Sequence, residues 1–192
     1  MTRDTELGDV LLALARGAIA GRLGVSTDAA PAHAALAAHG ATFVTLRLEG
    51  ELRGCIGTLE AHRPLGDDVR ANAVAAAFRD PRFAPLPVHE FAAVAIEVSV
   101  LSPSEPIDAR SERDALARLR PGVDGVVLAR GSLRATFLPQ VWDELRDPRD
   151  FLAALKHKAG LPPDFWDAQV TLARYAVVKY AERAARAAGV TT

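Results

Sequence analysis

The sequence predicts an α+β fold in which a largely antiparallel sheet is flanked by helices. Strand-like segments come in pairs joined by tight turns, which is typical of antiparallel hairpins. Segments with helical periodicity lie between the hairpins and do not alternate strictly with single strands. The chain has 192 residues, of which 49% are hydrophobic, so it can bury a sizeable core.

Helix-spaced apolar residues and capping signals define the expected helices. Gly24 ends the first, and Asp80-Pro81 prevents the second from continuing. Residues 26–40 hold either a short helix or a long loop. The other expected helices span about 4–23, 64–79, 111–119 and 147–160, and the tail is expected to be helical from Tyr180.

Alternating apolar residues define about six strands. Glu49-Gly50 and Gly131-Ser132 are the expected hairpin turns. The expected strands span 43–48, 52–58, 91–101, 126–130, 133–138 and 170–179. Because the helices around residues 111–165 stand apart from the first hairpin, we expect a smaller lobe there.

Composition argues against several function classes. The net charge is -1, which gives no support for nucleic-acid binding. A single cysteine excludes an internal disulfide, and the five histidines lack metal-ligand spacing, so we expect no metal site. No nucleotide-binding fingerprint is present, and we expect no cofactor. We also expect no membrane association and a cytoplasmic location, since no long apolar run or secretory signal occurs.

The segment Leu52-Arg53-Gly54-Cys55-Ile56-Gly57-Thr58 combines a strand pattern with two glycines, an arginine and the only cysteine. Alternation places Arg53, Cys55 and Gly57 on one face of the strand. Glycine within a strand marks a bulge or a close approach to the backbone. The segment is therefore either a bulged core strand with a small buried cysteine or an open strand with a reactive thiol beside a guanidinium.

Two further segments are candidate sites. Asp80-Pro81-Arg82-Phe83 is a stiffened loop that either holds a ligand or is locked by an Asp–Arg pair. In the segment from Arg134 to Gln140, Thr136 lies on a strand that is either part of a site or a half-exposed sheet edge.

Several segments together resemble the AMMECR-domain family, whose bacterial and archaeal members are called AmmeMemoRadiSam system protein A. The similarity extends from about Leu7 to Tyr180. It rests on the segment 52–58 and on residues 43–46, 80–83, 97–101, 121–126, 134–142 and 158–163. The resemblance implies a single domain over 1–192 with two unequal lobes and a cleft between them. The larger lobe would comprise about 1–110 plus 166–192, and the smaller about 111–165.

The resemblance also implies a location for the site and a set of partners. The residues that match family motifs and are carried over as a candidate site are Arg53, Gly54, Cys55, Gly57, Thr58, Asp80, Arg82 and Thr136. The implied partners are a Memo-like protein and a radical SAM enzyme, and the small-molecule or peptide ligand is not specified.

Because the family has no settled activity, whether the protein is an enzyme stays open. In one hypothesis Cys55 is a nucleophile or thiol ligand, and Arg53 binds an anionic group of the substrate. In the alternative, the domain is a non-catalytic protein- or ligand-binding module, and its glycine-bared strand pairs with a partner segment. A third hypothesis is redox sensing by Cys55 through an intermolecular disulfide.

Overall fold

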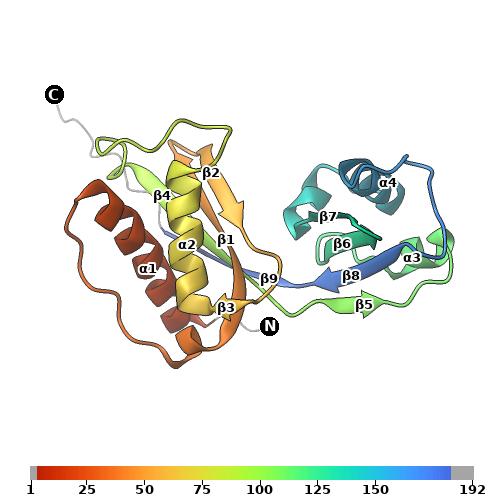
Figure 1. Ribbon diagram of the computed structural model, residues 1–192, viewed down its shortest axis with the longest axis horizontal. Helices are drawn as coiled ribbons and strands as arrows, with labels where there is room; N and C mark the ends of the chain where they lie inside the picture. Colours follow the sequence, from red (N-terminus) through yellow and green to blue (C-terminus); the bar gives the residue numbers. More distant parts are fainter. Residues whose placement is uncertain (1–3, 183–192) are drawn as a thin grey trace. The chain divides into compact units, whose positions relative to one another are not determined.

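The computed structural model describes residues 4–182, which divide between two compact units. Unit 1 runs to Leu101 and resumes at Val178, and unit 2 is Ser102–Val177. Each unit has its own sheet and its own helices (Figure 1). The α+β prediction and the antiparallel prediction are confirmed, but the strands form two sheets and not one.

Unit 1 pairs two long helices with one sheet. Its strands follow the order β2-β1-β4-β9, and the short β3 also pairs with β1. The elements are α1 (Thr5–Leu23), η1 (Ala34–Ala37), β1 (His39–Leu48), β2 (Glu51–Gly57), β3 (Arg63–Pro64), α2 (Leu65–Phe78), β4 (Val94–Leu101) and β9 (Val177–Ala181). The strand β2 lies at an edge of this sheet, so one side of its backbone has no strand partner.

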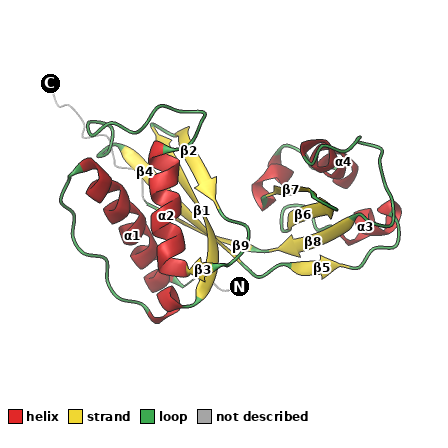
Figure 2. Ribbon diagram, viewed as in Figure 1, coloured by secondary structure: helices red, strands yellow, loops and turns green. Residues whose placement is uncertain are grey.

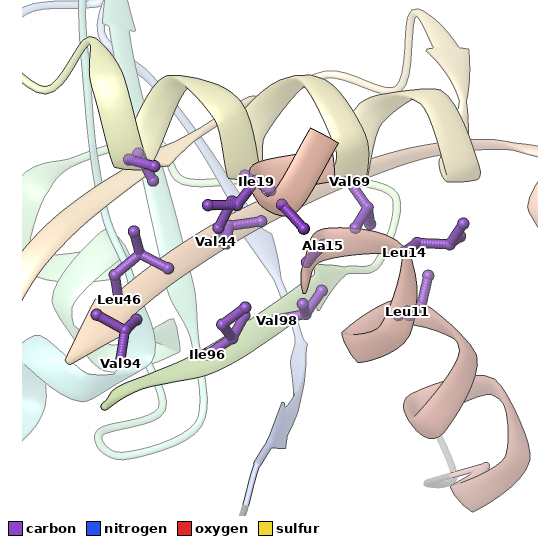
Figure 3. Packing of buried hydrophobic residues seen from close by; sticks show 14 of the residues in the cluster. Leu11, Leu14, Ala15, Ile19, Val44, Leu46, Val69, Val94, Ile96 and Val98 are labelled. Atoms are coloured by element: carbon purple, nitrogen blue, oxygen red, sulfur yellow. The ribbon is translucent and has the colours of Figure 1, made fainter. Parts of the chain in front are cut away.

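The core of unit 1 lies between the sheet and its helices, which both cover one face (Figures 1 and 2). Alternation in β1 and β4 directs Val44, Leu46, Ile96 and Val98 toward α1, and all four are fully buried (Figure 3). The opposite face of the same strands carries the odd-numbered residues of β1, such as Thr45. We call it the helix-free face, because α1 and α2 both pack on the other side.

Unit 2 has a sheet in the order β5-β8-β6-β7, with α4 packed on it. Its elements are β5 (Glu105–Ile107), α3 (Glu112–Arg118), β6 (Gly125–Arg130), β7 (Leu133–Phe137), η2 (Pro139–Asp143), α4 (Pro148–Lys158) and β8 (Thr171–Tyr175). Phe151 of α4 is fully buried and stacks on Trp142, with ring centroids 3.7 Å apart. These two rings are the centre of a core distinct from that of unit 1.

Several boundaries differ from the expected ones. The expected strand 170–179 is divided at Ala176 into β8 and β9, which belong to different sheets. Unit 2 extends beyond the expected 111–165 at both ends, because β5 and β8 pair within its sheet. Tyr180 lies in β9, and the rest of the expected tail helix falls almost entirely outside the described residues. The cleft stays a prediction.

Candidate functional site

Cys55 is partly buried, and its side chain lies on the helix-free face of unit 1. Cys55 in β2 lies opposite Thr45 in β1, and the Thr45 hydroxyl donates a hydrogen bond to Cys55 Sγ over 3.3 Å. The cysteine is therefore not the fully buried core residue that its small size permits. Thr45 is the one side chain of the described residues that is hydrogen-bonded to the thiol.

The outer edge of β2 at Cys55 is occupied by side chains from the loop that follows α2. The backbone N–H of Cys55 donates to Asp80 Oδ2 over 2.9 Å, and its carbonyl accepts from Arg82 Nη2 over 3.2 Å. Asp80 and Arg82 thus take the place of a neighbouring strand at this residue. The predicted Asp–Arg pair exists, and it also binds the segment that contains the cysteine.

Two parallel hydrogen bonds join Asp80 to Arg82. Arg82 Nε lies 2.9 Å from Asp80 Oδ1, and Arg82 Nη2 lies 2.7 Å from Asp80 Oδ2. The Asp80 side chain is 1% exposed, whereas that of Arg82 is 53% exposed. The hydrogen bonds from Arg82 outweigh burial and hold the pKa of Asp80 well below its usual value. Asp80 is therefore a permanent carboxylate at neutral pH.

Arg53 lies at a bulge in β2, and its side chain contacts the loop segment 84–90, which runs beside the edge of β2. Leu46 pairs with Gly54 and Arg47 with Leu52, so Arg53 is the extra residue of the ladder. Its Nε donates to Glu90 Oε2 over 2.8 Å, and its Nη1 donates to the carbonyl of Ala84 over 2.9 Å. With its side chain only 14% exposed, Arg53 holds the segment 84–90 against β2.

Both glycines of the segment 52–58 accommodate close contacts within the chain. A Cβ on Gly54 would collide with the backbone carbonyl of Ala76 in α2. A Cβ on Gly57 would collide with the ring of Phe43, its cross-strand neighbour. The close approach that glycine indicates is therefore made by a helix and an aromatic ring of unit 1.

The helix-free face brings together charged side chains that sequence reasoning did not select. Glu97 in β4 lies opposite Thr45, accepts from Arg47 Nε over 3.0 Å, and pairs with Lys179 Nζ over 2.7 Å. Burial acts to raise the pKa of Glu97, but the hydrogen bonds from Lys179 and Arg47 leave it below its usual value. Thr45 and Glu97 belong to the motifs 43–46 and 97–101. The sequence does not show that they lie beside Cys55, because that depends on how the strands pair.

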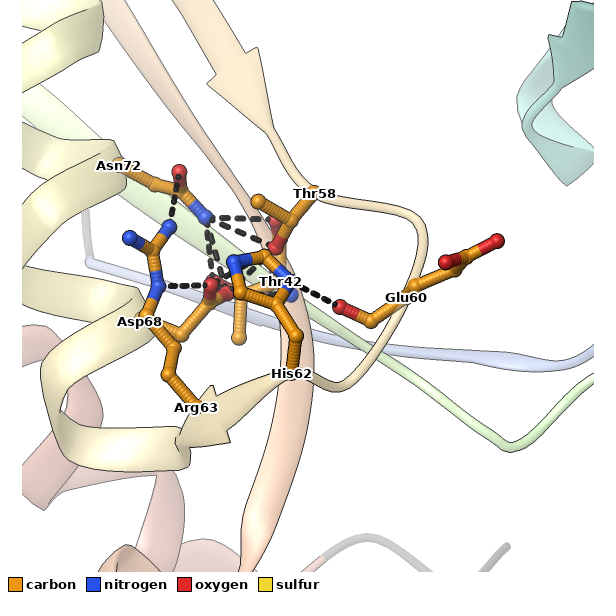
Figure 4. Close-up of polar contacts among 7 residues, drawn as sticks. All are labelled: Thr42, Thr58, Glu60, His62, Arg63, Asp68 and Asn72. Atoms are coloured by element: carbon orange, nitrogen blue, oxygen red, sulfur yellow. Dashed lines mark hydrogen bonds and ion pairs between the residues drawn. The ribbon is translucent and has the colours of Figure 1, made fainter.

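Thr58 belongs to a second polar cluster, centred on the fully buried Asp68 of α2 (Figure 4). Asp68 accepts from the Thr58 hydroxyl over 2.8 Å and from Arg63 Nε over 2.7 Å. It also accepts from the backbone N–H and the hydroxyl of Thr42, and from Asn72 Nδ2 over 2.9 Å. Every donor comes from unit 1, so this cluster fixes α2 to the strands that flank it.

Thr136 belongs to unit 2 and lies in β7. Its hydroxyl donates to the carbonyl of Val126 over 2.8 Å and lies 2.9 Å from the hydroxyl of Tyr175. Burial raises the pKa of Tyr175 to about 12. Thr136 therefore ties three strands of its own sheet together, while Arg53, Cys55, Asp80 and Arg82 gather around β2 of unit 1.

The described residues contain neither a metal-binding cluster nor a membrane-spanning helix. Between residues 4 and 182, the structure contains no group of three or more His, Cys, Asp or Glu side chains that could hold a metal ion. Over the same residues, no helix is long and apolar enough to span a lipid bilayer.

Comparison with known proteins gives consistent results. A protein of Methanothermobacter thermautotrophicus is 44% identical over 135 residues, which cover 69% of this chain and 70% of that protein. Protein MK0488 of Methanopyrus kandleri is 37% identical over 171 residues, covering 84% and 81%. The crystal structure of uncharacterized protein PH0010 from Pyrococcus horikoshii superposes with a TM-score of 0.83 at 33% identity, covering 95% of this chain and 94% of that one.

The family model described as AMMECR1 matches residues 12–180, which include both sheets and the segment around Cys55. The resemblance carried by the motifs is therefore confirmed, and this chain belongs to the AMMECR1 family.

Proposed function

We propose that this chain is a non-catalytic binding module, and that it binds an acidic segment of a protein partner on the helix-free face of unit 1. The proposal rests on one observation: the polar side chains around Cys55 already form hydrogen bonds within the fold. Arg53, Asp80 and Arg82 are all bonded within unit 1, while the thiol on the helix-free face is bonded to Thr45 alone among the described side chains.

The charge of this face favours an acidic partner. Arg47 and Lys179 share a single carboxylate, that of Glu97, and their side chains are 39% and 46% exposed. Phe43 and Cys55, both partly buried, add an aromatic ring and a thiol on the same face, beside the buried Thr45. A partner segment with a carboxylate could therefore bind either cation, while its apolar part contacts the ring.

The partners we propose are a Memo-like protein and a radical SAM enzyme, and the support for them is the family resemblance. Calorimetric titration of the full chain with each protein from the same organism tests this choice. We expect a measurable dissociation constant for at least one. The choice of partners is wrong if neither protein binds at about 100 μM, a weak affinity for a specific complex.

A charge reversal tests the surface. We expect Lys179→Glu to weaken the complex by about tenfold or more, because it replaces an attractive contact with a repulsive one. Arg22→Glu is the matched control, since it makes the same charge change at an exposed position at the end of α1. Equal affinity for Lys179→Glu and the unchanged chain would place the partner elsewhere.

Catalysis by Cys55 is the second candidate, favoured by the incomplete burial of the cysteine and by the Thr45 hydroxyl directed at its sulfur. Iodoacetamide alkylation at pH 7 discriminates between the two, with glutathione as the reference thiol. The binding module predicts alkylation no faster than that of glutathione. A rate at least about tenfold higher, which Thr45→Val reduces, would indicate an activated nucleophile.

A further inference from the structure

A groove between the two helices of unit 2 contains none of the candidate site residues considered above. It lies between α3 and the first half of α4 and has a volume of about 760 Å³. Leu116 and Ala117 of α3 line it from one side, Ala153 of α4 lines it from the other, and Pro163 contributes a further apolar surface. A volume of this size is within the range of small-molecule sites.

Each acidic side chain of this α3–α4 groove has a role in the fold. Glu112 binds Lys156, whose side chain is fully buried, with Nζ 2.7 Å from Glu112 Oε1. Asp147 caps α4 by accepting from the backbone N–H of Arg149 over 2.8 Å. Asp150 lies in the first turn of α4, where a negative charge interacts favourably with the helix dipole.

The two arginines of the groove have no comparable role. Arg113 comes from α3 and Arg149 from α4, and both are exposed. Within residues 4–182, neither guanidinium has a hydrogen bond or an ion pair. Most other arginines of the described chain bind a carboxylate, as Arg118 does with Asp114 over 2.8 Å on the same helix as Arg113. Two unpaired guanidiniums from different helices thus border one groove, next to its apolar residues.

We propose that the α3–α4 groove binds a small organic carboxylate, with its apolar body against Leu116 and Ala153 and its carboxylate between Arg113 and Arg149. Guanidinium groups bind carboxylates through paired, charge-assisted hydrogen bonds. A doubly charged phosphate fits less well, because Glu112, Asp147 and Asp150 border the same groove and repel additional negative charge.

A matched series of ligands tests this proposal on the full chain. The probes are 3-phenylpropionate, its neutral amide, 2-phenylethylamine and phenyl phosphate, each titrated into ¹⁵N-labelled protein and followed by amide chemical shifts. We expect 3-phenylpropionate to give saturable shifts at Leu116, Ala117 and Ala153. The amide, the amine and the phosphate should each bind about tenfold more weakly, the loss expected for one charge-assisted interaction.

The double variant Arg113→Ala/Arg149→Ala identifies the groups responsible. It should remove the preference for 3-phenylpropionate over its amide, while Arg22→Ala, an exposed arginine of α1, should leave that preference intact. The proposal is wrong if 3-phenylpropionate produces no saturable shifts in the groove. It is also wrong if the double variant retains the preference. Neither result tests the proposal for the helix-free face, because that proposal uses different variants and different binding partners.

Discussion

Gly54 lies where the backbone of α2 passes directly over β2. Because the group that a Cβ would meet is a main-chain carbonyl, no side-chain movement can relieve the collision. We expect Gly54→Ala to lower the free energy of unfolding by about 1–3 kcal/mol, the usual cost of overpacking. Urea denaturation followed by circular dichroism measures it.

Gly21→Ala is the matched control for that substitution. Gly21 lies in α1, and a Cβ added there would meet no atom within 4 Å. Alanine at this position should therefore raise stability by about 0.5–1 kcal/mol through helix propensity. If both variants have the same effect, close packing is not the reason for glycine at position 54.

Asp80 should make the stability of the chain depend on pH. Its pKa in the folded chain is depressed by Arg82, so its carboxylate stabilises the fold above the unfolded-state pKa of about 4. This contribution is lost as the pH falls from the unfolded-state pKa toward the folded-state pKa. Asp80→Asn should therefore cost about 1–3 kcal/mol at pH 7 and progressively less below about pH 4.

Denaturation of both proteins across this pH range measures the difference, and Asp9→Asn on the exposed side of α1 serves as the control. A difference between the wild type and Asp80→Asn that stays constant from pH 7 to pH 3 would contradict the assigned role.

Single residues show what the sequence could and could not predict about the site. Glycine at 54 indicated a close approach, but not that the approaching group is the carbonyl of Ala76. Arg53 was expected beside the thiol because strand alternation puts both on one face. A bulge shifts the register at that point, and the partner Glu90 lies 37 residues away in an irregular segment. The glycines of the segment indicate a bulge, but not that Arg53 is the extra residue, and the distant partner Glu90 has no local sequence signal.

At the scale of elements, the segment 80–90 packs along the edge of β2 that has no strand partner. Arg53 binds it through Glu90 and Ala84, and Leu86 anchors it with a backbone hydrogen bond to Ala77. We expect Arg53→Met to accelerate amide hydrogen exchange at Glu90 and Phe91, because methionine keeps the apolar stem and loses the donors. Exchange measured by NMR should leave Val98 in β4 unchanged.

Glu90→Gln provides an independent check, since it removes the ion pair but keeps a hydrogen-bond acceptor, and it should produce a smaller acceleration. If Arg53→Met leaves exchange at Glu90 and Phe91 unchanged, Arg53 does not hold this segment, and its assignment to ligand binding regains support.

The elements also show why some boundaries were predictable. Alternation and turn residues predicted both hairpins, because β1 with β2 and β6 with β7 are formed by neighbouring residues. The division of the expected strand 170–179 was not predictable. Its apolar pattern continues through Ala176, and only pairing with distant strands assigns β8 to one sheet and β9 to the other.

At the scale of the whole molecule, each unit has its own core, and both tryptophans of the chain, Trp142 and Trp166, belong to unit 2. Tryptophan fluorescence therefore reports on unit 2. We expect Phe151→Ala to destabilise unit 2 by about 3–5 kcal/mol, because it removes a fully buried ring stacked on Trp142. The urea midpoint followed by fluorescence should fall accordingly.

Hydrogen exchange in the same variant tests whether the units unfold separately. Amides of β6 and α4 should lose protection, while those of β1 and α1 should keep it. An equal loss in both units would indicate that the chain unfolds as one cooperative body. The matched change in unit 1, Ile19→Ala, should leave the fluorescence midpoint unchanged.

The occupied edge of β2 has a consequence for the behaviour of the protein at high concentration. An exposed strand edge can recruit an extended segment of a second molecule and so begin aggregation. At Cys55 the main-chain donor and acceptor are already bonded to Asp80 and Arg82, and Arg53 binds the adjoining segment at Ala84 and Glu90. By occupying the backbone of Cys55, Asp80 and Arg82 interrupt the edge that a second molecule would have to extend, so these two charged side chains protect solubility as well as stability.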